Sequence, residues 1–170
     1  MYIENRNILD EIMDITKDSK IGKYGGEPNT IKLVRRTGYL GFLKFFGYLS
    51  GDVNLNQCRI RTLRDLVIPT DFSGTIVLDG NRISDLKDFN LPKNFVGRIY
   101  MENNHIYSLK NLNLLYKNFS GVLDFSSNPV STFDGLVLSE DFAGKIVINS
   151  DLGHIGEINK NNYLDYVHKE

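Results

Sequence analysis

The sequence predicts an α/β solenoid, in which a repeated segment winds into stacked coils with a parallel β-sheet along one side. Two observations support this prediction: a glycine that recurs at nearly constant spacing, and an apolar pattern that follows each glycine. The glycines lie 23, 23, 24 and 23 residues apart in the 170-residue chain: Gly51, Gly74, Gly97, Gly121 and Gly144. Self-similarity with a period of this length is the signature of a repeat architecture.

After each glycine, two apolar residues alternate with variable ones, as in Ile76/Leu78 and Ile99/Met101. Such alternation over a few residues predicts a short strand with one buried face. Three residues after the second apolar position stands an almost uniform column: Cys58, Asn81, Asn104, Asn128 and Asp151. We expect the asparagines to point inward and to bond the turns of successive coils, because a carboxamide supplies both donors and an acceptor. The last member of the column is an aspartate, which lacks the donors, so we expect the ladder to end there.

A further apolar residue follows this column two positions later in four repeats: Ile60, Ile83, Ile106 and Val130. The combined pattern, L-x-L-x-x-N/C-x-L, resembles the leucine-rich repeats of bacterial and phage-type proteins. This resemblance implies a right-handed coil and a broad strand face of the kind that commonly binds other proteins. A composition rich in Asn, Lys and Ile is typical of an AT-rich genome, which fits a bacterium or its phage.

We divide the chain into three parts of one structural domain. Residues 1–49 form an N-terminal helical cap and a degenerate first repeat, residues 50–150 form five leucine-rich repeats, and residues 151–170 form a short C-terminal cap. Repeat proteins need such caps because the terminal coils would otherwise expose the core.

The N-terminal cap is expected to be an amphipathic helix over residues 5–20. Its apolar residues recur at helical spacing: Ile8, Leu9, Ile12, Met13 and Ile15. A rival interpretation is a helix that binds a partner and leaves its apolar face in water. Ile31–Leu33 is expected to form a sixth, degenerate strand, and Asn161–His168 to form the C-terminal cap as a helix or a strand.

The cysteine content and the first residues of the chain favour a cytoplasmic protein. The chain has one cysteine, so no disulfide framework is expected, and its first residues lack the layout of a secretory signal. No apolar run approaches the roughly 20 residues that a membrane helix needs.

The net charge of −1 conceals a basic N-terminal half and an acidic C-terminal third, an asymmetry that can orient an approaching partner.

The strand face is the first candidate binding surface. In the predicted register, an aromatic residue, Tyr100, lies beside Val77 with charged residues around the pair. Aromatic and arginine anchors inside a polar rim are typical of protein interfaces. We therefore expect a partner protein to contact Asn54, Val77, Asp79, Arg98, Tyr100, Glu102, Asn103, Asp124 and Val147. A small protein that acts through binding alone would be an inhibitor, a sequestering factor or an adaptor. The alternative is that these are ordinary solvated strand residues.

A basic edge is the second candidate surface, and it favours nucleic acid as an alternative ligand. Arginines on the turns after the ladder positions, joined by two arginines earlier in the chain, could track a phosphate backbone: Arg59, Arg61, Arg64 and Arg82, with Arg35 and Arg36. Against this alternative, the chain is not basic overall, and the strand face carries acidic residues.

Catalysis, metals and cofactors find little support in the sequence. The three histidines do not fall into a motif with the one cysteine, which occupies a ladder position and is expected to be buried. Asp79, Glu102 and Asp124 lie on adjacent predicted strands, but no backbone-oxygen motif accompanies them. We therefore expect a binding protein that is not an enzyme and holds no metal or cofactor.

Overall fold

The computed structural model describes most of the chain from Asp52 onward and two short segments before it. The described residues are 13–16, 30–33, 52–64, 66–115, 118–149, 155–159 and 161–162. Within these ranges the structure contains ten β-strands and no helix, so the helical part of the predicted α/β class is not found there.

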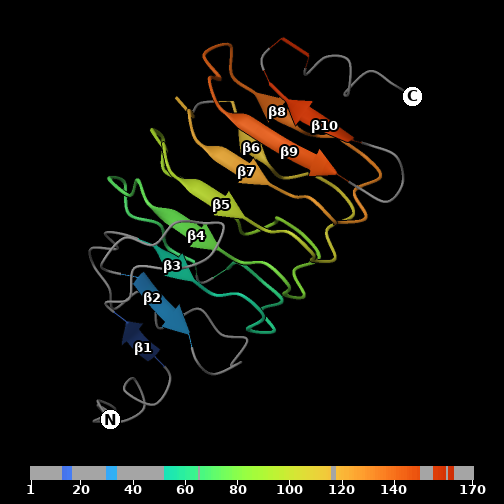
Figure 1. Cartoon of the computed structure of the whole chain (residues 1–170). Helices are drawn as coiled ribbons and strands as arrows, with labels where there is room; N and C mark the ends of the chain where they lie inside the picture. The colour runs from blue at the N-terminus through green and yellow to red at the C-terminus, as the bar shows by residue number, and fades with distance from the viewer. Residues whose placement is uncertain are drawn as a thin grey trace, which may run out of the picture.

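A mostly parallel sheet of eight strands runs along the molecule (Figure 1). Its order follows the chain: β1 (Met13–Thr16), β2 (Thr30–Leu33), β3 (Val53–Asn54), β4 (Thr75–Val77), β5 (Arg98–Tyr100), β7 (Val122–Asp124), β9 (Lys145–Asn149) and β10 (Ile155–Ile158). The six strands from β2 to β9 in this order run parallel, whereas β1 and β10 are antiparallel to their neighbours at the two ends. The sheet is open, since its two end strands do not pair with each other.

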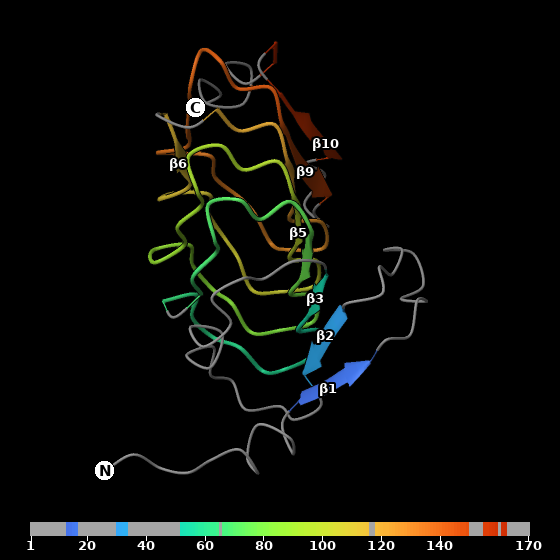
Figure 2. The ribbon, with the colours of Figure 1, turned by 90° about the vertical axis from the view of Figure 1, so that its left-hand side faces the viewer.

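The segments that return from one strand to the next lie across the molecule from this sheet (Figure 2). There β6 (Asn113–Leu114) and β8 (Val137–Leu138) form a separate two-stranded parallel sheet. Tight turns occupy other parts of the returning segments, such as the one closed by the Leu66 N–H group on the Leu63 carbonyl oxygen at 2.9 Å.

The apolar spacing predicts a helix over residues 5–20, and this prediction is wrong where the structure describes the segment. Met13–Thr16 forms β1, which pairs with β2 in the register Met13↔Leu33 and Ile15↔Ile31. Met13 and Ile15 alternate with polar residues, so they satisfy a period of two as well as a helical period. Pairing with β1 bonds the backbone groups on the side of β2 that would otherwise be an open edge of the sheet. The remainder of the predicted helix lies outside the described residues.

The expected strand at Ile31–Leu33 is confirmed, because β2 contains it and pairs parallel to β3. At the other end, β10 covers the last parallel strand by antiparallel pairing, with Glu157 opposite Val147. The predicted end of the ladder at Asp151 and most of Asn161–His168 lie outside the described residues.

The asparagine ladder predicted from the sequence is confirmed. Asn104 is 5% exposed, and its Nδ2 group donates to the carbonyl oxygens of Met101 in its own repeat and Leu78 in the preceding one, both at 3.0 Å. A third bond runs to the Glu102 carbonyl oxygen at 3.2 Å, and the Asn104 Oδ1 atom accepts the Ile83 N–H group at 3.1 Å. The same pattern of bonds recurs at Asn81 and Asn128. Each asparagine therefore bonds backbone groups of its own repeat and of the repeat before it.

Cys58 occupies the same column in the first described repeat and is buried, as predicted. Its Sγ atom lies 3.5 Å from the Asn56 carbonyl oxygen, a weak bond within the same turn. The ladder thus begins with a small apolar residue and continues with asparagine.

A column of phenylalanine rings fills the core beside the starts of the strands. The rings of Phe72, Phe95, Phe119 and Phe142 are buried and stack with centroid separations of 6.3, 5.7 and 5.4 Å. Interplanar angles of 12°, 15° and 4° keep the rings nearly parallel. Each ring therefore contacts the equivalent ring of the next repeat, which makes the core continuous along the sheet.

The repeated glycines let successive repeats approach where each strand begins. The Gly97 carbonyl oxygen accepts the Val122 N–H group at 3.0 Å, and the Gly121 carbonyl oxygen accepts the Lys145 N–H group at 3.0 Å. A β-carbon on Gly121 would collide with the Gly97 carbonyl oxygen and meet the Phe95 ring at 3.0 Å. Glycine recurs at this position because the neighbouring backbone leaves no room for a side chain.

We expect Gly121→Ala to lower the free energy of unfolding by about 2–3 kcal/mol, because the collision is with hydrogen-bonded backbone that has no space to shift. Urea denaturation followed by circular dichroism measures the change. Ser120→Ala is the matched control: Ser120 is exposed and adjacent, so its substitution should change stability by less than about 0.5 kcal/mol. Equal stabilities for the two variants would contradict the close approach.

Candidate functional site

The strand pairing confirms the register on which the candidate face was predicted. Residues opposite one another across the parallel strands form a central row: Asn54, Val77, Tyr100, Asp124 and Val147. A second row precedes it: Thr75, Arg98, Val122 and Lys145. Each row alternates with the buried apolar residues, so the two rows belong to the face of the sheet that points away from the core.

This outer face is buried at one end and open at the other. Val77 on β4 is only 2% exposed, and Asp52 and Thr75 beside it are also buried. On β5, by contrast, Arg98 is exposed and Tyr100 is half-buried. The prediction that Val77 offers apolar surface to a partner is therefore wrong. The pairing register decides which way a side chain points, but it does not decide whether that side meets water.

Asp79 was predicted to contact a partner, but the structure gives it an internal role. It is 9% exposed, and its Oδ1 atom accepts the Glu102 N–H group of the next repeat at 2.8 Å. Asp52 acts in the same way, since its Oδ1 atom accepts the Thr75 N–H group at 2.9 Å. Each of these two buried carboxylates accepts a backbone hydrogen bond from the next repeat, and so joins successive repeats at the ends of the strands.

Two further predicted contact residues bond their own turns. Asn54 Oδ1 accepts the Asn56 N–H group at 3.0 Å, and Asp124 Oδ1 accepts the Ser126 N–H group at 2.9 Å. Both side chains remain half-buried and so keep part of their surface at the face. Asn103 is exposed in the turn after β5, where a φ of 59° places it in the left-handed region that asparagine tolerates.

The accessible part of the face lies on β5, β7 and β9. We define the open strand face as Arg98, Tyr100, Glu102, Asn103, Val122, Asp124, Lys145 and Val147, all of which are exposed or half-buried. It joins one aromatic ring and two valines with charges of both signs. Lys145 forms an ion pair with Glu157 of β10 at 3.0 Å.

Sequence reasoning missed Glu157, because β10 is not part of the repeat. The antiparallel pairing of β10 with β9 places Glu157 opposite Val147, on the side of the sheet that carries the open strand face. An isolated strand after the last repeat has no periodic signal that would place it.

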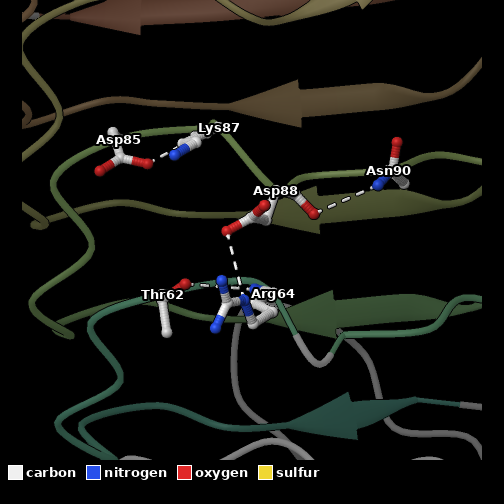
Figure 3. A network of polar contacts seen from close by, with 6 residues as sticks. All are labelled: Thr62, Arg64, Asp85, Lys87, Asp88 and Asn90. Atoms are coloured by element: carbon white, nitrogen blue, oxygen red, sulfur yellow. Dashed lines mark hydrogen bonds and ion pairs between the residues drawn. The ribbon is translucent and has the colours of Figure 1, made fainter.

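The predicted basic edge is present in part. Arg59, Arg61, Arg64 and Arg82 are exposed on the turns that follow the ladder, whereas Arg35 and Arg36 lie outside the described residues. Figure 3 shows this region, in which Arg64 Nε lies 3.9 Å from a carboxylate oxygen of Asp88 in the next repeat. Both side chains of that pair are solvent-accessible, so the attraction between them is weak.

The described part of the chain contains no group of three or more His, Cys, Asp or Glu side chains arranged to hold a metal ion. No helix long and apolar enough to cross a membrane occurs among the described residues. Comparisons with protein-family models, with curated proteins and with solved structures find no match to this chain.

Proposed function

We propose that the chain is a leucine-rich-repeat solenoid that binds a protein partner through the open strand face. The open strand face supports this proposal because it brings an arginine and an aromatic ring, Arg98 and Tyr100, to accessible positions on the same side of β5. Rows of such residues across parallel strands give a rigid surface, because each backbone is bonded to the next repeat. In protein interfaces, a few aromatic and arginine side chains usually carry most of the binding energy.

The solenoid proposal rests on three features that recur with the sequence period. Asparagine bonds each turn to the one before it, phenylalanine rings stack between repeats, and glycine permits their close approach. The phenylalanine and glycine contacts join equivalent residues 23 or 24 positions apart. Each asparagine bonds backbone groups of the neighbouring repeat that lie 21 to 27 residues away. Stacking of identical units in chain order is how solenoids build a continuous core.

The chemistry of the face supports binding rather than catalysis. Arg98 is exposed and Tyr100 is half-buried, with Asp124 and Val147 following on the next strands. A chain that binds without reacting acts by occupying its partner, as an inhibitor, a sequestering factor or an adaptor. Its one cysteine, buried in the core, suits a cytoplasmic setting.

We expect the double variant Arg98→Glu/Tyr100→Ala to weaken binding of the protein partner by about 30-fold or more, since loss of a hot-spot residue costs at least about 2 kcal/mol. The partner used as probe is the protein that immobilised wild-type chain retains from its host lysate. Titration calorimetry with that purified protein then measures the affinity of each variant.

The matched control is Val67→Ala/Lys93→Glu, which also truncates one accessible side chain and reverses one positive charge. Both residues are exposed and lie outside the open strand face. The control should bind like wild type, and both double variants should keep the wild-type circular dichroism spectrum. Unchanged affinity of Arg98→Glu/Tyr100→Ala in a folded chain would rule out this face as the binding site.

A further inference from the structure

Three successive turns, each beginning directly after a ladder position, place positive charges side by side on one flank of the molecule. The turns are residues 59–64, 82–87 and 105–110. Backbone bonds hold them in register: Arg82 N–H donates to the Ile60 carbonyl oxygen at 2.8 Å, and His105 N–H donates to the Ile83 carbonyl oxygen at 2.9 Å. Equivalent positions of adjacent turns therefore lie next to each other, like the strands that precede them.

The cations of these turns fall into two lines across the repeats. One line contains Arg59 and Arg82 and continues to His105, and the other contains Arg64, Lys87 and Lys110. We define the basic flank by its six exposed cations: Arg59, Arg61, Arg64, Arg82, Lys87 and Lys110. Strands lie about 4.8 Å apart, so each line spans about 10 Å over three repeats.

Acidic residues offset only part of this charge. The turns and the residues that directly follow them carry three acids, Asp65, Asp85 and Asp88, against the six cations of the basic flank. The Asp85 Oδ1 atom accepts the Lys87 backbone N–H group at 3.0 Å, which fixes the turn in which both residues lie (Figure 3). Within the described residues, Arg64 is the one cation of the flank with an ion pair. Five cations thus face solvent without a paired carboxylate in this part of the chain.

An aromatic ring lies between the two lines. Tyr107 is 58% exposed, the highest value among the large apolar side chains that the structure describes. It sits between His105 and Lys110 in the third turn, and its carbonyl oxygen accepts the Ser131 N–H group at 2.9 Å. The backbone under the ring is therefore fixed, while the ring itself packs little against the protein.

We infer that the basic flank is a binding site for single-stranded nucleic acid, separate from the open strand face. The lines of cations neutralise successive phosphates, and Tyr107 provides a surface on which one unpaired base stacks. Single-strand binding proteins combine these two elements, a positive track and an aromatic platform. A span of about 10 Å corresponds to roughly three stacked nucleotides. A duplex would offer no free base for Tyr107, and an acidic peptide would use the cations without the ring.

The test is the binding of a fluorescent single-stranded oligonucleotide of about 15 nucleotides to the full chain, followed by anisotropy at about 50 to 200 mM salt. If about four phosphates are neutralised, the affinity should fall by about 50-fold over this range. Arg82→Gln/Lys87→Gln should reduce the slope of log affinity against log salt by about 1.4, since each phosphate contact contributes about 0.7. Lys93→Gln removes an exposed positive charge outside the flank and should leave the slope unchanged.

Tyr107→Ala separates stacking from charge. It should weaken binding about fivefold or more without changing the salt slope, and Tyr107→Phe should restore the affinity. No binding at about 50 mM salt would overturn the inference, as would equal binding of a duplex of the same length. If polyglutamate bound more tightly than the oligonucleotide, and Tyr107→Ala left that binding unchanged, the ligand would be an acidic protein segment. That result would also overturn the inference. None of these outcomes depends on the protein partner of the open strand face.

Discussion

Asn104→Asp is expected to lower the free energy of unfolding by about 4 kcal/mol at neutral pH. The substitution keeps the shape of the side chain and its acceptor toward the Ile83 N–H group. It removes the Nδ2 donor and turns a carboxylate oxygen toward three carbonyl oxygens, those of Leu78, Met101 and Glu102. A buried charge without a partner costs about 3–5 kcal/mol, a large share of the total stability of a small domain.

The neighbouring residue provides a matched control for this substitution. Asn103→Asp makes the same chemical change one position away, at an exposed side chain whose left-handed backbone aspartate also tolerates. Its effect should stay within about 0.5 kcal/mol. Urea denaturation at neutral pH measures both variants. If the two aspartate variants were equally stable, the ladder would not hold the repeats together.

Phe119→Ala is expected to lower the free energy of unfolding by about 4 kcal/mol. Its ring is fully buried and lies 5.7 Å from the Phe95 ring and 5.4 Å from the Phe142 ring. Truncation removes apolar burial, leaves a cavity that the backbone bonds on either side keep from closing, and breaks two ring contacts. Phenylalanine-to-alanine changes in cores cost about 3–5 kcal/mol, and each aromatic pair adds about 0.5–1.5 kcal/mol.

Two comparisons show whether this loss comes from the stack. Phe119→Leu fills most of the space, so its loss should be clearly smaller than that of the alanine variant. Val96→Ala truncates an exposed apolar side chain and should be nearly neutral. Thermal unfolding followed by circular dichroism ranks the three variants. A neutral Phe119→Ala would mean that the ring does not lie between its two neighbours.

The repeat made much of the fold predictable from sequence. Equivalent positions of the repeats have nearly the same surroundings, so a residue type that recurs at one position indicates the environment of that position in every repeat. Asn81, Asn104 and Asn128 recur where turns need internal hydrogen-bond partners, and the structure places all three in the ladder. The register of the open strand face followed from the same period, which is why Tyr100 and Asp124 fall in one row.

Features outside the repeat, or dependent on distant segments, were not predictable in this way. The strand β1 was missed because Met13 and Ile15 fit two periods, and pairing with β2 decides between them. The burial of Val77 and Asp79 was not predictable, because the local pattern fixes which side of the sheet a residue faces and not whether that side is exposed. The position of Tyr107 between two lines of cations depends on turn register rather than on any apolar spacing.

The exchange of side-chain amide protons in the ladder tests the central claim most directly. After transfer into D2O, nuclear magnetic resonance should show slow exchange of the Nδ2 protons of Asn81, Asn104 and Asn128, because each group is buried and donates to backbone carbonyl oxygens of two repeats. The Nδ2 protons of the exposed Asn103 should exchange at once. Equally fast exchange at all four residues would contradict stacked repeats joined from within.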